Sequence, residues 1–470
     1  MINILNILLP EIFLSLSIFA ILMIGVFIKN SFNLIFNLSS LIIVITIAII
    51  FNNTSDTEKI FLDSFVRDKF SNFFKILILI SSLFVLNSSK NFIEDNKLNR
   101  FEYPIIVLIS ILGMFFMVSS NDLILFYLGL ELQSLSLYIL AAIDRDNLRS
   151  SESGIKYFVL SALSSGLLLY GCSLLYGFTG STNFENISVE LNKLNTGAVF
   201  AMVFILVGLA FKVSAVPFHM WTPDVYQGAP TSITNFFAIV PKAVGLAVII
   251  RFMDLPFKNI IEEWQTIIIF ISIASMILGS VAAIGQKNIK RLLAYSSISH
   301  MGYALAGVAT GTASGYTSTI IYITIYIVMN MGTFACLYLM KTDEKYTEKI
   351  DDLAGLSNNK PMLAFSFLIL FFSLAGIPPL GGFFAKFFVF MSVIESELYA
   401  LAIIGLLTTV ISAFYYLKVI KIIYFDDIKI KFDDVRNLSI KTTIVLSCLI
   451  LSLYFISPSI INSLLDGLFI

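Results

Sequence analysis

The chain has 470 residues, a formal net charge of −1, 58% hydrophobic residues and only 13% charged residues. Soluble domains carry about 25% charged residues, so this composition and a mean hydropathy of +0.91 exclude an ordinary soluble protein. The near-neutral charge gives no indication of a nucleic-acid partner. We therefore predict an all-α polytopic membrane protein.

Apolar stretches of roughly 20 residues, the length that crosses a bilayer as a helix, recur about fourteen times along the chain. They predict membrane helices near residues 4–28, 32–52, 71–89, 103–119, 121–143, 154–177, 197–223, 230–253, 264–286, 291–311, 314–340, 361–392, 397–424 and 440–465. The polar connections between them are too short for a soluble domain. The first apolar run has no basic segment before it and no small-residue cleavage site, so it is expected to be a retained span.

The lysines and arginines indicate the orientation, because cations near span ends are retained on the cytoplasmic side. The odd-numbered connections carry most of them, for example Lys287, Lys290 and Arg291 in one connection. This bias predicts cytoplasmic odd connections and both termini on the outer side of the membrane. The cluster of Lys287, Lys290 and Arg291 could also bind lipid headgroups or a partner.

Two of the expected spans should be broken. The seventh contains Pro217, and the twelfth contains LAGIPPLGGFFAKF, with two prolines and three glycines near its middle. Proline removes a backbone donor and glycine lowers helix propensity. In transporters such breaks commonly mark the ion site.

The two breaks lie about 170 residues apart, which suggests two five-helix repeats, the second inverted because five is odd. The expected divisions are three helices in 1–102, a first repeat in 103–255, a second repeat in 256–424 and a last helix in 425–470. This prediction is based on the two paired breaks and not on sequence similarity between the repeats.

Four ionisable residues, Glu131, Lys212, Lys242 and Lys386, lie inside expected spans. A charge at mid-membrane costs roughly 2.5–3.5 kcal/mol on insertion scales, so each requires a partner, a hydrated cavity or a function. Lys212 is the candidate partner of Glu131, although the two could form an inert structural pair. Lys242 is too deep to reach the surface, and desolvation disfavours the charged form of a lysine, as a proton carrier requires.

Three further residues are weaker candidates for a proton path. Lys156 lies near a span end and could simply extend to the membrane surface. His219 and His300 are the only histidines, and each could relay protons or merely form hydrogen bonds. Serines and Tyr303 around His300 could hold water. We expect Glu11 to have a structural or subunit-contact role, and Lys75 and Lys418 to anchor span ends.

The three cysteines, Cys172, Cys336 and Cys448, are far apart in apolar segments, so the sequence predicts neither a disulfide framework nor an iron–sulfur site. No dinucleotide fingerprint or phosphate-binding loop is present. The chain is therefore expected to bind no metal or redox cofactor itself.

Several motifs together resemble the antiporter-like membrane subunits of respiratory complex I, the proton-pumping NADH:quinone oxidoreductases. They are GLAFKVSAVPFHMWTPDVYQGAPT from Gly208, QKNIKRLLAYSSISHMGYALAG from Gln286, LAGIPPLGGFFAKF from Leu374, and LLPEIF near the start. Tyr226 and Gln227 are typical of the N-type members. The resemblance covers essentially the whole chain, and its first two motifs are highly specific.

This resemblance implies fourteen helices with two inverted repeats, and a proton path through Glu131, Lys212, Lys242 and Lys386. It also implies sister antiporter-like subunits and lipids as partners, with NADH, FMN, iron–sulfur clusters and quinone bound by other subunits of the complex. Two alternatives remain open. A sodium/proton antiporter would need several oxygen ligands at the breaks, where this chain has lysines. A purely structural subunit would need none of the four charges for transport.

Overall fold

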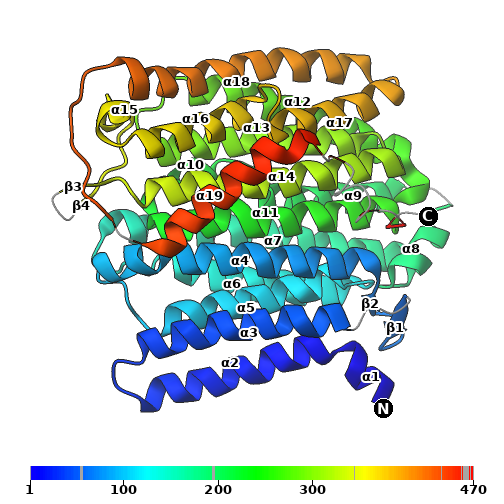
Figure 1. The fold of residues 1–470 in the computed structure, drawn as a ribbon. Coiled ribbons are helices and arrows are strands. Elements are labelled where there is room, and N and C mark those ends of the chain that lie inside the picture. Colours follow the sequence, from blue (N-terminus) through cyan, green and yellow to red (C-terminus); the bar gives the residue numbers. More distant parts are fainter. Residues whose placement is uncertain are drawn as a thin grey trace. The chain divides into compact units, whose positions relative to one another are not determined.

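The chain is mostly helical in the computed structural model, which describes residues 2–52, 57–192, 196–342, 345–435, 437–456, 458, 465 and 467–468. The N-terminal helices are α1 (Ile2–Ile7), α2 (Leu9–Phe27), α3 (Phe32–Asn52), α4 (Lys69–Asp95), α5 (Glu102–Val118), α6 (Leu123–Ala141), α7 (Leu148–Thr179), α8 (Phe184–Glu190) and α9 (Thr196–Lys212). They are followed by α10 (Trp221–Gly228), α11 (Thr231–Asp254), α12 (Ile261–Ala283), α13 (Ile289–Ala309), α14 (Ala313–Leu337), α15 (Leu356–Asn359), α16 (Pro361–Ala375), α17 (Gly381–Glu395), α18 (Tyr399–Phe425) and α19 (Leu438–Leu453) (Figure 1).

Each expected span coincides with a helix or, for the first span and at the two expected breaks, with a pair of helices. Within the described residues, ten helices are long and apolar enough to cross a membrane, and α5, α9 and α16 are shorter apolar helices. The prediction of an all-α polytopic membrane protein is confirmed. Some boundaries were wrong: α4 and α7 are longer than expected, and most of the expected span 440–465 beyond α19 lies outside the described residues.

Two short hairpins were not predicted. Strands β1 (Glu58–Ile60) and β2 (Phe65–Arg67) pair antiparallel in one connection, and β3 (Lys341–Thr342) and β4 (Lys345–Tyr346) pair in another. Arg67 forms an ion pair with Glu58 directly across the first hairpin. Two- and three-residue strands are too short to leave a periodic signal in a sequence.

Helix starts and close helix contacts have local causes. The Asp122 carboxylate caps α6 by accepting hydrogen bonds from the backbone N–H groups of Ile124 and Leu125. Helices α5 and α6 approach closely at Gly113 and Gly129, where an added Cβ would lie under 3 Å from the backbone of the other helix. Glycine at both positions therefore lets these two membrane helices pack backbone to backbone.

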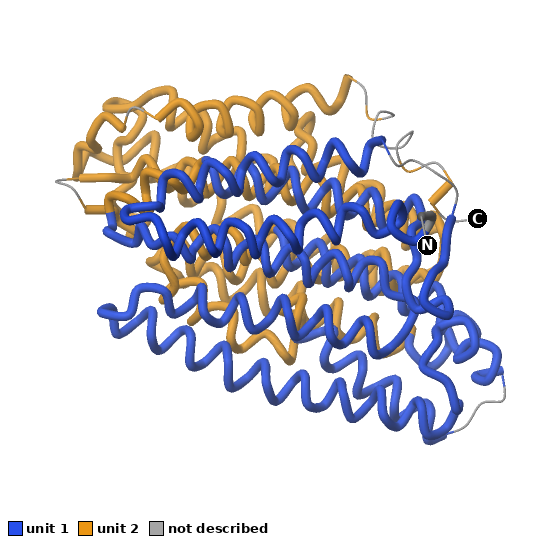
Figure 2. Tube along the Cα trace, turned by 90° about the horizontal axis from the view of Figure 1, so that it is seen from below, with its two compact units in different colours: residues 1–87, 96–211, 240–264 blue, residues 88–95, 212–239, 265–470 orange. Residues whose placement is uncertain are grey.

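The chain divides into two compact units (Figure 2). Unit 1 comprises residues 1–87, 96–211 and 240–264, and within it α2 packs on α3 and α5, while α6 packs on α5 and α7. Unit 2 comprises residues 88–95, 212–239 and 265–470, and within it α14 contacts α13, α16, α17 and α19, while α18 packs on α16. Unit 1 holds Glu131, Lys156 and Lys242, and unit 2 holds Lys212, His219, His300 and Lys386.

Candidate functional site

The first break lies where the sequence predicts it. Helix α9 ends at Lys212, and no helix forms again before α10 begins at Trp221. Lys212 is only 8% exposed, and within unit 2 the backbone N–H of Val216 donates to the Ser275 hydroxyl at 2.8 Å. His219 lies half-buried in the break. A side chain therefore satisfies part of the backbone that the break releases, as membrane burial demands.

Two of the sequence motifs meet at helix α10. The Arg291 guanidinium donates to Asp224 at 2.9 Å and to Gln227 at 3.0 Å. The buried Lys290 ammonium donates to the carbonyl of Ala229 at 2.8 Å and pairs with Glu348 at 2.5 Å. The prediction that these residues mark the cytoplasmic side stays a prediction, and the contacts of Lys290 and Arg291 described here are made within unit 2. Both side chains fix the helix that follows the first break.

Lys242 lies in a fully enclosed part of the chain. It is 1% exposed, it follows Pro241 inside α11, and the most apolar 18-residue stretch of this helix is completely buried. Its side chain is therefore buried within the protein, and its depth in the membrane stays a prediction. A cation in this position has no access to the membrane surface along its own side chain.

The second break surrounds Lys386 with carbonyl oxygens. Helix α16 ends at Ala375, Gly376 takes a left-handed conformation with φ of 87°, and α17 begins at Gly381. The Lys386 ammonium donates to the carbonyls of Ala375 at 2.9 Å and Leu374 at 3.2 Å. These are the free carbonyls at the negative end of a helix dipole, which favour a cation. Among the described residues, no carboxylate forms an ion pair with Lys386.

His300 is the centre of a buried hydroxyl network in unit 2. Its Nδ1 lies 2.6 Å from the Tyr322 hydroxyl, and its Nε2 lies 3.1 Å from the Tyr416 hydroxyl, which also bonds Ser296. A neutral imidazole donates at one nitrogen and accepts at the other. Exchanging the tautomer therefore reverses the direction of both hydrogen bonds, which is what a proton relay needs.

Tyr303 connects this network to the second break. Its ring lies 6.0 Å from the His300 ring, and the Lys386 ammonium lies 5.0 Å from the Tyr303 ring centroid. The Tyr303 hydroxyl is 3.3 Å from both Thr408 and Ser412. Of the seven candidate residues, unit 2 thus brings His300 and Lys386 together around one tyrosine.

The remaining candidates have different surroundings. Glu131 is half-buried, its Oε1 atom has no hydrogen-bond partner among the described residues, and Tyr127 and Tyr138 lie near enough to interact with its charge. Lys156 is half-exposed and forms an ion pair with Glu152 at 2.8 Å along one face of α7. The pairing of Glu131 with Lys212 stays a prediction.

The sequence prediction missed a buried ion pair in unit 1. Lys75 and Glu11 lie 2.6 Å apart, with side chains 1% and 3% exposed, and Lys75 also faces the rings of Phe65 and Phe115. The expectation that Lys75 is an interfacial anchor was wrong, because its ammonium is buried and pairs with Glu11 inside unit 1. The sequence did contain a signal for this ion pair: two residues of opposite charge, Glu11 and Lys75, each lie near the start of an expected span.

The sequence prediction also overlooked most of the buried hydroxyl network around His300. Thr408, Ser412 and Tyr416 are spaced four residues apart on α18, so they share one helix face. That polar stripe in an apolar helix was a readable signal for a partner helix with complementary groups. Its partner is the Ser296, His300 and Tyr303 face of α13.

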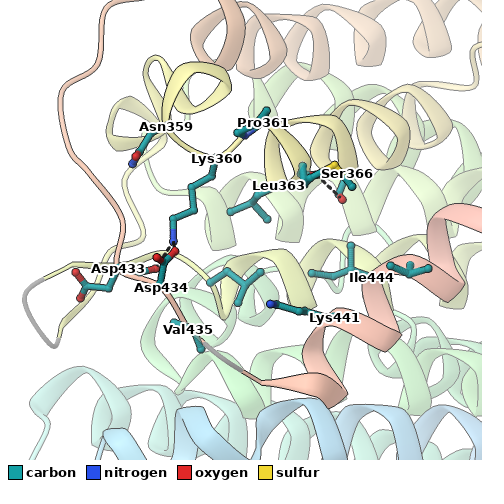
Figure 3. Close-up of a pocket in the computed structure, with 13 residues that line it drawn as sticks. Asn359, Lys360, Pro361, Leu363, Ser366, Asp433, Asp434, Val435, Lys441 and Ile444 are labelled. Atoms are coloured by element: carbon teal, nitrogen blue, oxygen red, sulfur yellow. Dashed lines mark hydrogen bonds and ion pairs between the residues drawn. The ribbon is translucent and has the colours of Figure 1, made fainter.

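A separate cavity of about 630 Å³ lies at the ends of α16 and α19 in unit 2 (Figure 3). Lys360 pairs there with Asp434 at 2.7 Å, and Lys441 and Ile444 also line the cavity. It contains none of the candidate residues. Among the described residues, no group of three or more histidine, cysteine, aspartate or glutamate side chains could hold a metal ion.

Comparisons with known proteins agree with this geometry. Residues 120–412 match the family described as NADH:quinone oxidoreductase/Mrp antiporter, TM. A relative named NADH-quinone oxidoreductase subunit N from Pelagibacter ubique is 58% identical over 456 residues, covering 97% of each chain.

Solved structures share the fold. A chain of respiratory complex I from Thermus thermophilus has a TM-score of 0.82 and 28% identity, covering 97% of this chain and 99% of its own. A chain of the Mrp complex from Dietzia has a TM-score of 0.86 and 20% identity, covering 98% and 96%. The second likeness concerns the fold alone. The chain belongs to the NADH:quinone oxidoreductase/Mrp antiporter membrane family.

Proposed function

We propose that the chain is an antiporter-like membrane subunit of a proton-pumping NADH:quinone oxidoreductase, in the position of the subunit N of its relatives. Its partners are the other membrane subunits, including sister antiporter-like subunits, and membrane lipids. NADH oxidation and quinone reduction occur in other subunits, which hold the FMN and iron–sulfur clusters. The chain moves protons from the cytoplasm to the outside of a bacterial inner membrane, with both termini on the outer side.

The observation that carries this proposal is the burial of three lysines in membrane helices. Lys212, Lys242 and Lys386 are 8%, 1% and 6% exposed. Each placement costs roughly 2.5–3.5 kcal/mol on insertion scales. Two of the three lie at the breaks, where carbonyl and amide groups are released from helical bonding. If these three positions had only a structural role, apolar side chains would fill them at a lower free-energy cost.

The proton path starts with Glu131 and Lys212, continues to Lys242 and ends through His300 and Lys386, with His219 and Lys156 as accessory groups. A change in the distance from Glu131 to Lys212 would alter the affinity of Lys212, and then of Lys242, for a proton. A tenfold change in the proton affinity of a lysine needs only about 1.4 kcal/mol. The displacement of one charge in a low-dielectric interior is sufficient to provide it.

The test is Lys242→Met in the assembled complex, in inverted membrane vesicles that oxidise NADH. We expect proton transport to fall by about tenfold or more, the scale of losing a positioned proton-transfer group, and quinone reduction to fall with it. Lys258→Met, an exposed lysine next to α12, is the matched control. Normal proton transport per NADH in an assembled Lys242→Met complex would refute the role of Lys242.

The sodium/proton antiporter alternative makes a different prediction. Sodium-dependent proton movement in vesicles without NADH would support it. A structural subunit would keep normal pumping after all four charges, Glu131, Lys212, Lys242 and Lys386, are replaced together.

A further inference from the structure

We propose that the cavity at the ends of α16 and α19 in unit 2 binds a zwitterionic phospholipid whose headgroup carries a primary ammonium, as in phosphatidylethanolamine. The cavity measures about 630 Å³, and ligand sites in proteins commonly measure about 300–1,000 Å³. A whole phospholipid is larger, so its headgroup lies in the cavity and its acyl chains extend along the helices. This inference gives a defined site to the membrane lipids of the proposed function, and it does not depend on proton transport.

The cavity lies where two apolar helices begin. Helix α16 starts at Pro361 and α19 starts at Leu438, and the two helices pack against each other. Lys360 and Asp434, joined by their ion pair, line the cavity together with Lys441 (Figure 3). Lipid headgroups lie at the level where apolar membrane helices end, and basic pockets between such helices bind headgroups.

The charges of the cavity favour a headgroup without net charge. Lys360 and Lys441 bring two positive charges, and Asp433 and Asp434 bring two negative ones. The pair of Lys360 and Asp434 is weak, because the Asp434 side chain is 91% exposed. An anionic lipid would therefore meet no net positive charge, whereas a zwitterion meets an opposite charge at each of its own.

Lys441 is placed to bind the lipid phosphate. Its side chain is exposed, and it forms no ion pair with any described residue. An ammonium forms short, strong hydrogen bonds with phosphate oxygens. Asn359 adds a donor, because its buried side-chain nitrogen has no hydrogen-bond partner in the described part of the chain.

The Asp434 carboxylate is placed to bind the lipid ammonium. A carboxylate has about four acceptor positions, so it can keep Lys360 and still accept a further hydrogen bond. A primary ammonium donates such a bond. The quaternary ammonium of a choline headgroup has no N–H group, so the contact distinguishes the two zwitterions.

Apolar side chains continue from the cavity along both helices. Met362 and Phe365 are exposed on α16, and Val445 and Leu449 are exposed on α19. Residues three or four positions apart share one helix face. Met362 and Val445 also line the cavity, so the apolar surface that receives the acyl chains begins at the headgroup site.

The test measures lipid binding directly. The purified complex is incubated with phosphatidylethanolamine that carries a photoactivated diazirine on one acyl chain, and the crosslinked peptides are identified by mass spectrometry. We expect crosslinks concentrated on α16 and α19. Unlabelled phosphatidylethanolamine should compete about tenfold better than phosphatidylglycerol or phosphatidylcholine, which is the effect of one charge-assisted hydrogen bond.

Two pairs of variants test the headgroup contact and the shape of the site. Lys441→Gln removes the cation for the phosphate, and its control is Lys429→Gln, an exposed lysine before α19 that does not line the cavity. Val445→Trp fills the cavity, and its control is Val410→Trp, at an exposed position on α18. At low lipid concentration, crosslinking to α16 and α19 should fall by about tenfold in Lys441→Gln and Val445→Trp only.

Three results would overturn the proposal. Even labelling of all lipid-facing helices, unchanged in both variants, would show non-specific lipid contact only. Equal competition by phosphatidylglycerol or phosphatidylcholine would show that the headgroup is not recognised. Absence of crosslinks to α16 and α19 in the intact complex would show that another subunit covers the cavity. None of these results involves proton transport, so the Lys242→Met test decides the proposed function separately.

Discussion

Lys75 in unit 1 and Lys386 in unit 2 are both buried in membrane helices, but the charges of these two lysines are compensated in different ways. Lys75 in unit 1 faces the Glu11 carboxylate at 2.6 Å between two aromatic rings. Lys386 in unit 2 faces two carbonyls and the ring of Tyr303, with no ion pair among the described residues.

This difference decides whether the protonation state of a buried lysine is fixed or can change. If Lys75 released its proton, an uncompensated buried carboxylate would remain, which is costly. If Lys386 released its proton, only neutral groups would remain around a neutral amine. A full counter-charge therefore makes a structural site, whereas dipoles make a site that can gain and lose a proton.

The largest expected effect follows from breaking the counter-charged pair. Lys75→Met leaves Glu11 buried without its cation, which should destabilise the folded subunit by about 3–5 kcal/mol. Thermal inactivation and the yield of assembled complex measure this loss. The double variant Glu11→Gln with Lys75→Met should recover most of it. A single variant as stable as the native complex would contradict the structural role of this pair.

The next effect concerns transport rather than stability. Lys386→Met removes a buried cation that has no fixed counter-charge, so the complex should assemble nearly normally. NADH-driven proton transport should fall by about tenfold or more, because the carrier at the end of the network is lost. If Lys386→Met reduced the yield of assembled complex as much as Lys75→Met does, Lys386 would also be structural. The contrast between the two lysines would then be wrong.

A third variant extends the comparison to a second ion pair in unit 1, between Asp68 and Arg251. Both carboxylate oxygens of Asp68 lie 3.0 Å from the Arg251 guanidinium. Burial by itself raises the pKa of Asp68, but the Arg251 charge and hydrogen bonds from Ser71 hold it below its usual range.

A lowered folded-state pKa contributes stability above the unfolded value of about 3.9, and that stability is lost as the pH falls through the folded value. Asp68→Asn should cost about 1–3 kcal/mol near neutral pH, and less at pH 3. Thermal unfolding of the purified complex at the two pH values measures the difference. A cost independent of pH would show that the charge of Asp68 is not what stabilises the site.

The smallest effect is expected at Lys156. Its pair with Glu152 is half-exposed, and such helix pairs contribute about 0.3–0.5 kcal/mol. Lys156→Gln should therefore leave thermal stability within that range, with at most a small change in proton transport. A loss of transport comparable to that of Lys386→Met would show that exposure is a poor guide to function here.

The membrane architecture and the positions of both breaks were predictable from the sequence, because hydropathy and helix-breaking residues act locally. Pro217 and the Gly376–Gly382 segment interrupt helices regardless of what packs around them. The position of Lys242 in the middle of a long apolar helix was predictable for the same reason, since the apolar run that contains it is local in the sequence.

Which charges meet was decided only by the tertiary structure. Lys75 and Glu11 are 64 positions apart in the printed sequence, and each lies near a span end, where a lysine can equally reach the membrane surface. The position of Lys290 and Arg291 near a span end predicted a topology signal, whereas their contacts with α10 and Ala229 arise from helix packing. The sequence determined where charges and breaks lie along the membrane helices, but helix packing determined whether each charge faces a carboxylate, carbonyl dipoles or water. That choice depends on contacts between distant segments, which local patterns do not encode.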